Sequence, residues 1–268
     1  MSGWILAAAA ALVAIALILV VVARTRRVRA LEEALAQTTD NLEHLEQSFS
    51  RFAPQGVVEM LSGGARKIEP TRRDVTVMFT DIVGFTGLSE SIDPGVLVPI
   101  LNDYFRRMTR VIREHHGHVS RIMGDGLMAL FGSLDTNPWQ SADAVRAALA
   151  MRDALAKLNQ ELVEKGQSEL RIGIGLHRGD CVAAVIGSQD MMEFTVMGDP
   201  VNIAARVESL TRTHGVDILV TDAIREQLDA RFVLKEMPPA LVKGKTEPVS
   251  TWAVETFDSA RTVAASNE

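Results

Sequence analysis

The stretch VTVMFTDIVGFTGLSE, residues 75–90, decides how the rest of this chain is interpreted. An almost continuous apolar run from Val75 to Phe79 is typical of a strand that is buried on both faces. The run leads to one carboxylate, Asp81, and then to a turn containing glycine, Gly84-Phe85-Thr86. A buried strand that ends on an aspartate presents a hard oxygen ligand at the edge of a sheet, which suits a divalent cation.

A second carboxylate stands in a similar setting further along the chain. Asp125 lies in IMGDGLMALFG, residues 122–132, and the pair Asp125-Gly126 between two apolar runs predicts a tight hairpin. Each aspartate alone also has a purely structural interpretation, as a turn residue or a strand end. Two strand-end carboxylates together are the minimum that holds two divalent cations over a phosphate chain.

Composition narrows the classes of function. A chain of 268 residues holds one sizeable domain with appendages. Its net charge of −6 argues against a nucleic-acid partner, since such proteins usually carry a basic face. The single cysteine, Cys181, precludes an internal disulfide and suits a reducing compartment. Its apolar surroundings, CVAAVIG, predict a small buried side chain rather than a reactive thiol.

The N-terminal segment predicts a membrane anchor. Residues 4–23 form an uninterrupted apolar stretch of 20 residues, about 30 Å as a helix, which is enough to cross a bilayer. Four arginines follow directly, whereas a cleaved signal peptide would carry its positive charges before the apolar stretch. The positive-inside rule therefore predicts a single-pass protein of the inner (plasma) membrane, with the remaining chain in the cytoplasm. The four arginines are Arg24, Arg26, Arg27 and Arg29.

Residues 24–53 carry a heptad pattern. Eight consecutive positions alternate by three and four, and this period favours a parallel two-stranded coiled coil. The alternative is one amphipathic helix packed on its own domain. Pro54 interrupts the pattern, and residues 54–71 form a linker. The heptad positions are Val28, Leu31, Leu35, Thr38, Leu42, Leu45, Phe49 and Phe52.

Residues 72–256 alternate between strand and helix signals, which predicts an α+β domain with helices on one face of a mixed sheet. The polar tail, residues 257–268, is expected to be disordered. The expected strands are Val75–Phe79, His118–Ile122, Leu127–Phe131, Arg171–His177, Cys181–Ile186 and Ile218–Val220. The expected helices are Pro94–His116, Trp139–Glu164 and Val201–Arg212.

Two further segments carry polar groups suited to a nucleotide. In EFTVMGDPVNIAARVESL, residues 193–210, Asn202 and Arg206 are four apart and share a helix face. Such a pair, taken alone, is also common on ordinary surfaces. Lys243 and Lys245 lie in VKGK, where they place ammonium groups on a loop made flexible by glycine, a contact for phosphate that is nonspecific by itself.

In this order, the segments resemble the class III nucleotidyl cyclases, the adenylyl and guanylyl cyclase family. The resemblance rests on five ordered motifs between about Arg72 and Val254. The segment RFAPQGVVEML just upstream also resembles the one that precedes many bacterial members. The five motifs are DIVGFT, RIMGDGLMALFG, GIGLHRGDCVAAVIGS, FTVMGDPVNIAARVE and VKGK.

The resemblance implies a ferredoxin-like βαββαβ core and a head-to-tail homodimer with active sites across the interface. It implies that Asp81, Asp125 and the carbonyl of Ile82 hold two Mg²⁺ or Mn²⁺ ions. One ion would activate the ribose 3′-hydroxyl of ATP for attack on the α-phosphate, and the other would neutralise the departing pyrophosphate.

The same resemblance assigns the remaining site residues. Asn202 orients the ribose, Arg206 stabilises charge on the α-phosphate and Lys243 contacts the outer phosphates, all from the partner chain. Phe85 and Thr86, at the end of DIVGFT, are implied to contact the substrate.

The residues that select the base depart from the family pattern. Adenylyl cyclases usually hold Lys, and guanylyl cyclases Glu, at the position of Arg121, while Thr195 takes the partnering position. A guanidinium only donates, so Arg121 suits N1 of adenine, although it also pairs with O6 of guanine. Thr195 can accept from the adenine amino group, which favours ATP.

The sequence therefore predicts a membrane-anchored, homodimeric adenylyl cyclase. Two alternatives stay open: a guanylyl cyclase, and a catalytically silent nucleotide-binding module that serves only to dimerise. A diguanylate cyclase is disfavoured because no GGDEF-like string occurs.

Overall fold

The structure, a computed structural model, describes residues 69–187, 192–240 and 248–261, together with scattered positions between 24 and 41. The chain divides into two units, Met1–Ala53 and Pro54–Glu268. In the first unit every described position is helical, and the three described heptad residues, Val28, Leu35 and Thr38, are exposed. No helix within the described residues is long and apolar enough to cross a membrane. The predicted span, residues 4–23, lies outside them, as does most of the predicted coiled coil and linker.

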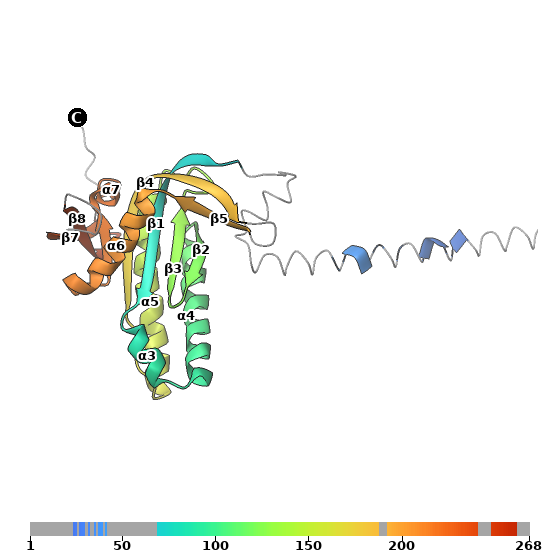
Figure 1. The fold of residues 1–268 in the computed structure, drawn as a ribbon, viewed down its shortest axis with the longest axis horizontal. Coiled ribbons are helices and arrows are strands. Elements are labelled where there is room, and N and C mark those ends of the chain that lie inside the picture. The colour runs from blue at the N-terminus through green and yellow to red at the C-terminus, as the bar shows by residue number, and fades with distance from the viewer. Residues whose placement is uncertain are drawn as a thin grey trace, which may run out of the picture. The chain divides into compact units, whose positions relative to one another are not determined.

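The second unit alternates strands and helices along the chain (Figure 1). Its strands are β1 (Thr71–Ile82), β2 (Gly117–Met123), β3 (Gly126–Phe131), β4 (Ile172–Gly187), β5 (Met192–Met197), β6 (Ile218–Thr221), β7 (Phe232–Ala240) and β8 (Val249–Phe257). Its helices are α3 (Phe85–Ser91), α4 (Pro94–Glu114), α5 (Gln140–Glu164), α6 (Asp199–His214) and α7 (Asp222–Arg225).

The strands form one mixed sheet in the order β2-β3-β1-β4-β6-β8-β7, and β5 pairs with β4 off this path. The first four positions, with β1 antiparallel to both β3 and β4, are the βαββαβ arrangement predicted from the sequence. The predicted α+β class is confirmed. Strand β6 then adds in parallel to β4, and β8 and β7 complete that edge in antiparallel pairing.

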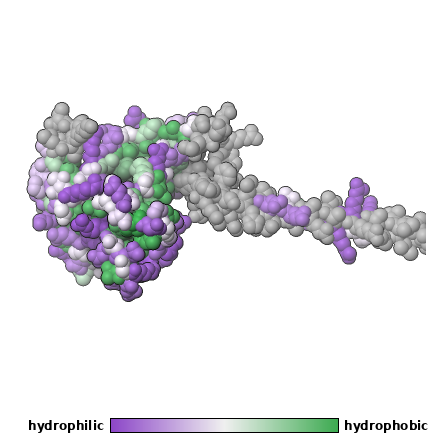
Figure 2. Space-filling view, turned by 60° about the horizontal axis from the view of Figure 1, so that its bottom comes forward, coloured by the Kyte–Doolittle hydropathy of each residue, from purple (hydrophilic) through white to green (hydrophobic). Residues whose placement is uncertain are grey.

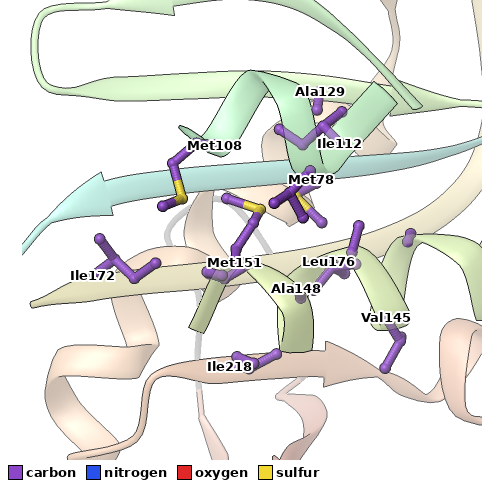
Figure 3. Packing of buried hydrophobic residues seen from close by; sticks show 14 of the residues in the cluster. Met78, Met108, Ile112, Ala129, Val145, Ala148, Met151, Ile172, Leu176 and Ile218 are labelled. Atoms are coloured by element: carbon purple, nitrogen blue, oxygen red, sulfur yellow. The ribbon is translucent and has the colours of Figure 1, made fainter. Parts of the chain in front are cut away.

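Helices cover both faces of the sheet, so the prediction that they lie on one face was wrong. The larger core lies where α4 and α5 pack on one face, and Figure 3 shows Met108 and Met151 from these two helices lying close to Met78 of β1. On the other face, Ala204 of α6 packs with Val75 and Val77 of β1. Strand β1 is therefore buried on both faces, as its continuous apolar run predicted.

Glycine explains two differences from the predicted elements around the site. Gly84 takes a left-handed conformation (φ 76°) and begins helix α3, where the sequence predicted only a turn. The hairpin between β2 and β3 turns at Gly124 and Asp125, one residue earlier than predicted, because Gly124 takes the positive φ of 62°. Asp125 is therefore the last residue of the turn itself.

Three further elements also differ from the prediction. Helix α4 ends at Glu114, two residues early, because His116 adopts the left-handed conformation (φ 61°). The two strands expected around residue 179 are one continuous strand, β4. Phe257, expected to be the first residue of a disordered tail, is instead the last residue of β8 and packs against Phe232, and residues 262–268 lie outside the described residues. Helix α7 and strands β5, β7 and β8 were not predicted.

Helix α6 lies unusually close to β4 because two glycines face it. A Cβ added to Gly175 would lie 2.1 Å from the backbone nitrogen of Glu208. One added to Gly173 would lie 2.3 Å from Thr211 Oγ1. No side chain fits in this gap, so the motif GIG of β4 sets the distance between the helix and the sheet.

We predict that Gly175→Ala lowers the free energy of unfolding by about 2–3 kcal/mol, because α6 has to move away from the sheet. Urea denaturation of the full chain, followed by circular dichroism, measures the change. The matched control is Gly87→Ala in α3, where an added Cβ meets nothing within 4 Å. That change is expected to be neutral or to stabilise by up to about 1 kcal/mol. Equal effects of the two substitutions would contradict the close approach of α6.

Candidate active site

The two aspartates predicted to act together do lie side by side. Asp81 is the second-last residue of β1, and the β2–β3 hairpin places Asp125 beside it. A Cβ added to Gly126 would lie 2.7 Å from the carbonyl oxygen of Thr80 and 3.2 Å from Asp81 Oδ1. The glycine therefore lets the hairpin approach the end of β1. Burial and the adjacent Asp125 carboxylate raise the pKa of Asp81, while Arg212 opposes the increase.

The chemistry of this donor set suits Mg²⁺ or Mn²⁺. Both side chains offer carboxylate oxygens, which these hard cations prefer, and the raised pKa of Asp81 reflects negative charge gathered in one partly buried place. Among the described residues, no three His, Cys, Asp or Glu side chains converge on one point. Coordination beyond the two aspartates would therefore come from backbone, water or substrate oxygens. Ile82, whose carbonyl is a predicted ligand, is the last residue of β1.

Two residues that the sequence analysis missed complete this cluster. Arg212, in the last turn of α6, donates from Nη2 to Asp81 Oδ2. The same Nη2 lies 3.3 Å from Glu208 Oε1. Burial raises the pKa of Glu208 to about 7. The signal was present in the sequence, because Glu208 and Arg212 are four apart on a predicted helix.

Helix α6 presents its polar residues in two directions. At about 100° per residue, Asn202 and Arg206 lie roughly 120° around the helix from Glu208 and Arg212. The second pair faces Asp81 of the same chain. Asn202 is exposed and Arg206 is partly buried, and neither side chain has a hydrogen bond or ion pair with a described residue. The structure therefore does not bring Asn202 and Arg206 to the aspartates of their own chain.

The predicted base-selecting residues lie together on β2 and β5. Thr195 is buried, and its hydroxyl lies 3.4 Å from Ser120 Oγ, which also donates to the carbonyl of Phe194 at 3.1 Å. Arg121 forms a two-pronged ion pair with Glu193, with Nε–Oε1 at 2.9 Å and Nη2–Oε2 at 2.5 Å. Sequence analysis missed Glu193, because only the fold, which places β5 near β2, reveals its contact with Arg121.

The three remaining predicted residues are placed as follows. Phe85, the first residue of α3, packs against the main hydrophobic core. Thr86 follows it and is exposed. Lys243 lies outside the described residues.

Comparison with known proteins identifies relatives across this unit. The family model "Adenylate and Guanylate cyclase catalytic domain" matches residues 68–256. An adenylate cyclase of Anabaena cylindrica is 34% identical over 239 residues, which is 85% of this chain and 47% of that protein. The chain thus spans about half of this relative, and 31% of adenylate cyclase 1 of Rhizobium meliloti.

Solved structures of both kinds of cyclase are similar to the chain. The guanylyl cyclase Cya2 is 31% identical, with a TM-score of 0.68, over 73% of this chain and 98% of that one. The adenylyl cyclase CyaB from P. aeruginosa is 28% identical, with a TM-score of 0.67, over 73% of this chain and 100% of that one.

Proposed function

Since the chain belongs to the family of adenylate and guanylate cyclase catalytic domains, we propose that it converts ATP to 3′,5′-cyclic AMP and pyrophosphate. The observation that carries the proposal is the placement of Asp81 beside Asp125 at the end of β1. The reaction forms the bond between O3′ and the α-phosphorus and breaks the bond from that phosphorus to pyrophosphate. The hydroxyl proton is released.

The family resemblance and the chemistry of each side chain support the following roles. Asp81 and Asp125, with the Ile82 carbonyl, hold two Mg²⁺ or Mn²⁺ ions, which when bound lower the pKa of the 3′-hydroxyl and neutralise charge on the phosphates. Asn202 orients the ribose, and Arg206 stabilises charge that grows on the α-phosphate. We propose that Lys243 contacts the outer phosphates and that Phe85 and Thr86 contact the substrate. Positioning and electrostatics supply most of the catalysis in such chemistry.

A homodimer follows from the two directions of α6. Asp81 lies on one side of this helix, while Asn202 and Arg206 point elsewhere, so a second copy has to supply the complementary half of each site. Apolar residues gather in patches on the face drawn in Figure 2. Exposed apolar side chains on the hairpins suit a subunit interface. These side chains are Ile122 and Met123 on β2, Ile186 on β4 and Met197 on β5.

The N-terminal unit supports the same arrangement. Exposed Val28 and Leu35 occupy heptad positions, and a coiled coil with a second copy would bury them. We propose that residues 4–23 anchor this dimer in the plasma membrane, with the second unit in the cytoplasm. The coiled coil would then hold the two copies at a high effective concentration.

A specific observation also favours a second candidate, a guanylyl cyclase. Glu193 places an acceptor directly beside the donor Arg121. Guanine presents O6 as an acceptor and N1–H as a donor, so this pair could contact both groups. ATP remains our first choice because Thr195 offers a hydroxyl that can accept from the adenine amino group.

We predict that the full chain, solubilised in detergent, forms cyclic AMP and pyrophosphate from ATP with Mn²⁺ or Mg²⁺, and that Asp81→Ala lowers the rate at least about a hundredfold. Chromatography and mass spectrometry identify the products. The control is Asp135→Ala, an exposed aspartate between β3 and α5. A dimer that binds nucleotide without forming a cyclic product, with either metal, would contradict the proposal and favour the silent module.

If each active site is shared between two chains, two inactive variants with changes in different halves of the site should restore activity when they form a dimer together. Asp81→Ala and Arg206→Ala chains are each expected to be inactive alone. When they are co-expressed at equal levels, half of the dimers combine one chain of each kind, and one of their two sites is intact. About a quarter of the wild-type rate per chain should return, since each site draws residues from both copies. A mixture that stays inactive would show that each site is built within one chain.

The Arg121–Glu193 pair predicts a measurable change in base preference. Glu193→Gln removes the charged acceptor for guanine and frees Arg121 to donate to N1 of adenine. We expect the ratio of kcat/KM for ATP over GTP to rise about tenfold, as the loss of one charged hydrogen bond implies. Glu236→Gln on β7, an exposed glutamate on the opposite edge of the sheet, is the matched control. A ratio that falls would mean that Glu193 helps to select ATP.

A further inference from the structure

We propose that Arg212 is a positioning residue that sets the affinity of the aspartate pair for divalent cations, by serving as an internal counter-ion that the incoming cation displaces from Asp81. The inference rests on the proposed function, because it takes Asp81 as a cation ligand. It concerns how strongly the site holds its ion, which the resemblance to other cyclases does not address.

The contact occupies one of the two oxygens of Asp81 that a cation could use. Arg212 Nη2 donates to Asp81 Oδ2, while Oδ1 of the same carboxylate faces the hairpin at Gly126. One carboxylate oxygen cannot be held by a guanidinium and also coordinate a cation without strong repulsion between the two positive charges. A cation on either oxygen of Asp81 would lie close to the Arg212 guanidinium, and the repulsion between the two positive charges favours displacement of Arg212.

Glu208 offers the displaced guanidinium a second acceptor. Its Oε1 lies 3.3 Å from the same nitrogen, Nη2, and its side chain is only 8% exposed. The guanidinium has room to turn, because 43% of the Arg212 side chain is exposed. Arg212 can therefore leave Asp81 and remain paired with a carboxylate one helical turn away.

The position of α6 does not depend on this ion pair. Ala204, Val207 and Thr211 are buried against the sheet, and the glycines of β4 already fix how closely the helix approaches. A substitution at Arg212 should therefore leave the helix in place and change mainly the charge around Asp81. A purely structural role would give the opposite pattern, with a loss of stability and no gain in cation affinity.

The test measures Mn²⁺ binding to the full chain without nucleotide, by electron paramagnetic resonance of free Mn²⁺ at low ionic strength. We expect Arg212→Gln to lower the Kd for Mn²⁺ about three- to tenfold, because the ion no longer competes with a fixed positive charge. Arg212→Lys keeps the charge and should stay close to the wild type. The matched control is Arg110→Gln on α4, which breaks the exposed pair with Glu114 and should leave the Kd unchanged.

The outcomes separate this inference from the proposed function. If the wild type binds Mn²⁺ and Asp81→Asn weakens this binding, the cation site is supported. In that case, an unchanged or higher Kd for Mn²⁺ in Arg212→Gln would overturn only the role of Arg212. If Asp81→Asn leaves binding unchanged, both proposals fail. If Arg212→Gln does not fold, the helix does depend on the ion pair, and the inference is again overturned.

Discussion

The rest of the structure depends on one electrostatic constraint, two carboxylates held next to each other at the end of a core strand. Asp81 and Asp125 repel each other, and partial burial adds to the cost of keeping both charged. Packing and strand pairing hold the two carboxylates in place despite this cost. Strand β1 is buried on both faces, and the hairpin that carries Asp125 pairs with β1 through β3. Locally unfavourable charge on a well-packed frame is typical of a functional site.

Helix α6 connects this constraint to the assembly of the molecule. The glycines of β4 bring the helix so close that Arg212 reaches Asp81. The same closeness fixes the rotation of α6, and rotation determines that Asn202 and Arg206 point away from these aspartates. If Asn202 and Arg206 act as proposed, a single copy holds both halves of a site without being able to join them. The proposed dimer would then be a consequence of helix packing as much as of the apolar surface.

The sequence was informative where a local pattern fixes the structure. The apolar run of β1, the hairpin at Asp125 and the long periodic helices α4 and α5 all follow from spacing and turn chemistry. Arg212 and Glu193 were missed for a different reason: their contacts with Asp81 and Arg121 join segments more than 70 residues apart and depend on helix rotation and on how β5 lies near β2. Continuous β4 was predicted as two strands because Gly179 lies between the two apolar runs and glycine normally indicates a break. In the structure Gly179 continues the pairing with β1 and makes room for Pro200 of α6.

Base selection shows why single positions are an unsafe guide to substrate. Arg121 alone is a donor and favours adenine N1, but the structure places the acceptor Glu193 against it. The pair as a whole has donor and acceptor character, and its effect on a purine depends on which group turns toward the base. The ion pair holds the Arg121 and Glu193 side chains in one orientation. A base that needs only one of the two groups has to break the pair, and the free energy of breaking it contributes to the selectivity between bases. If these residues contact the base as proposed, specificity would belong to the Arg121–Glu193 pair together with Thr195, and a substitution at any one of them would change what the others offer.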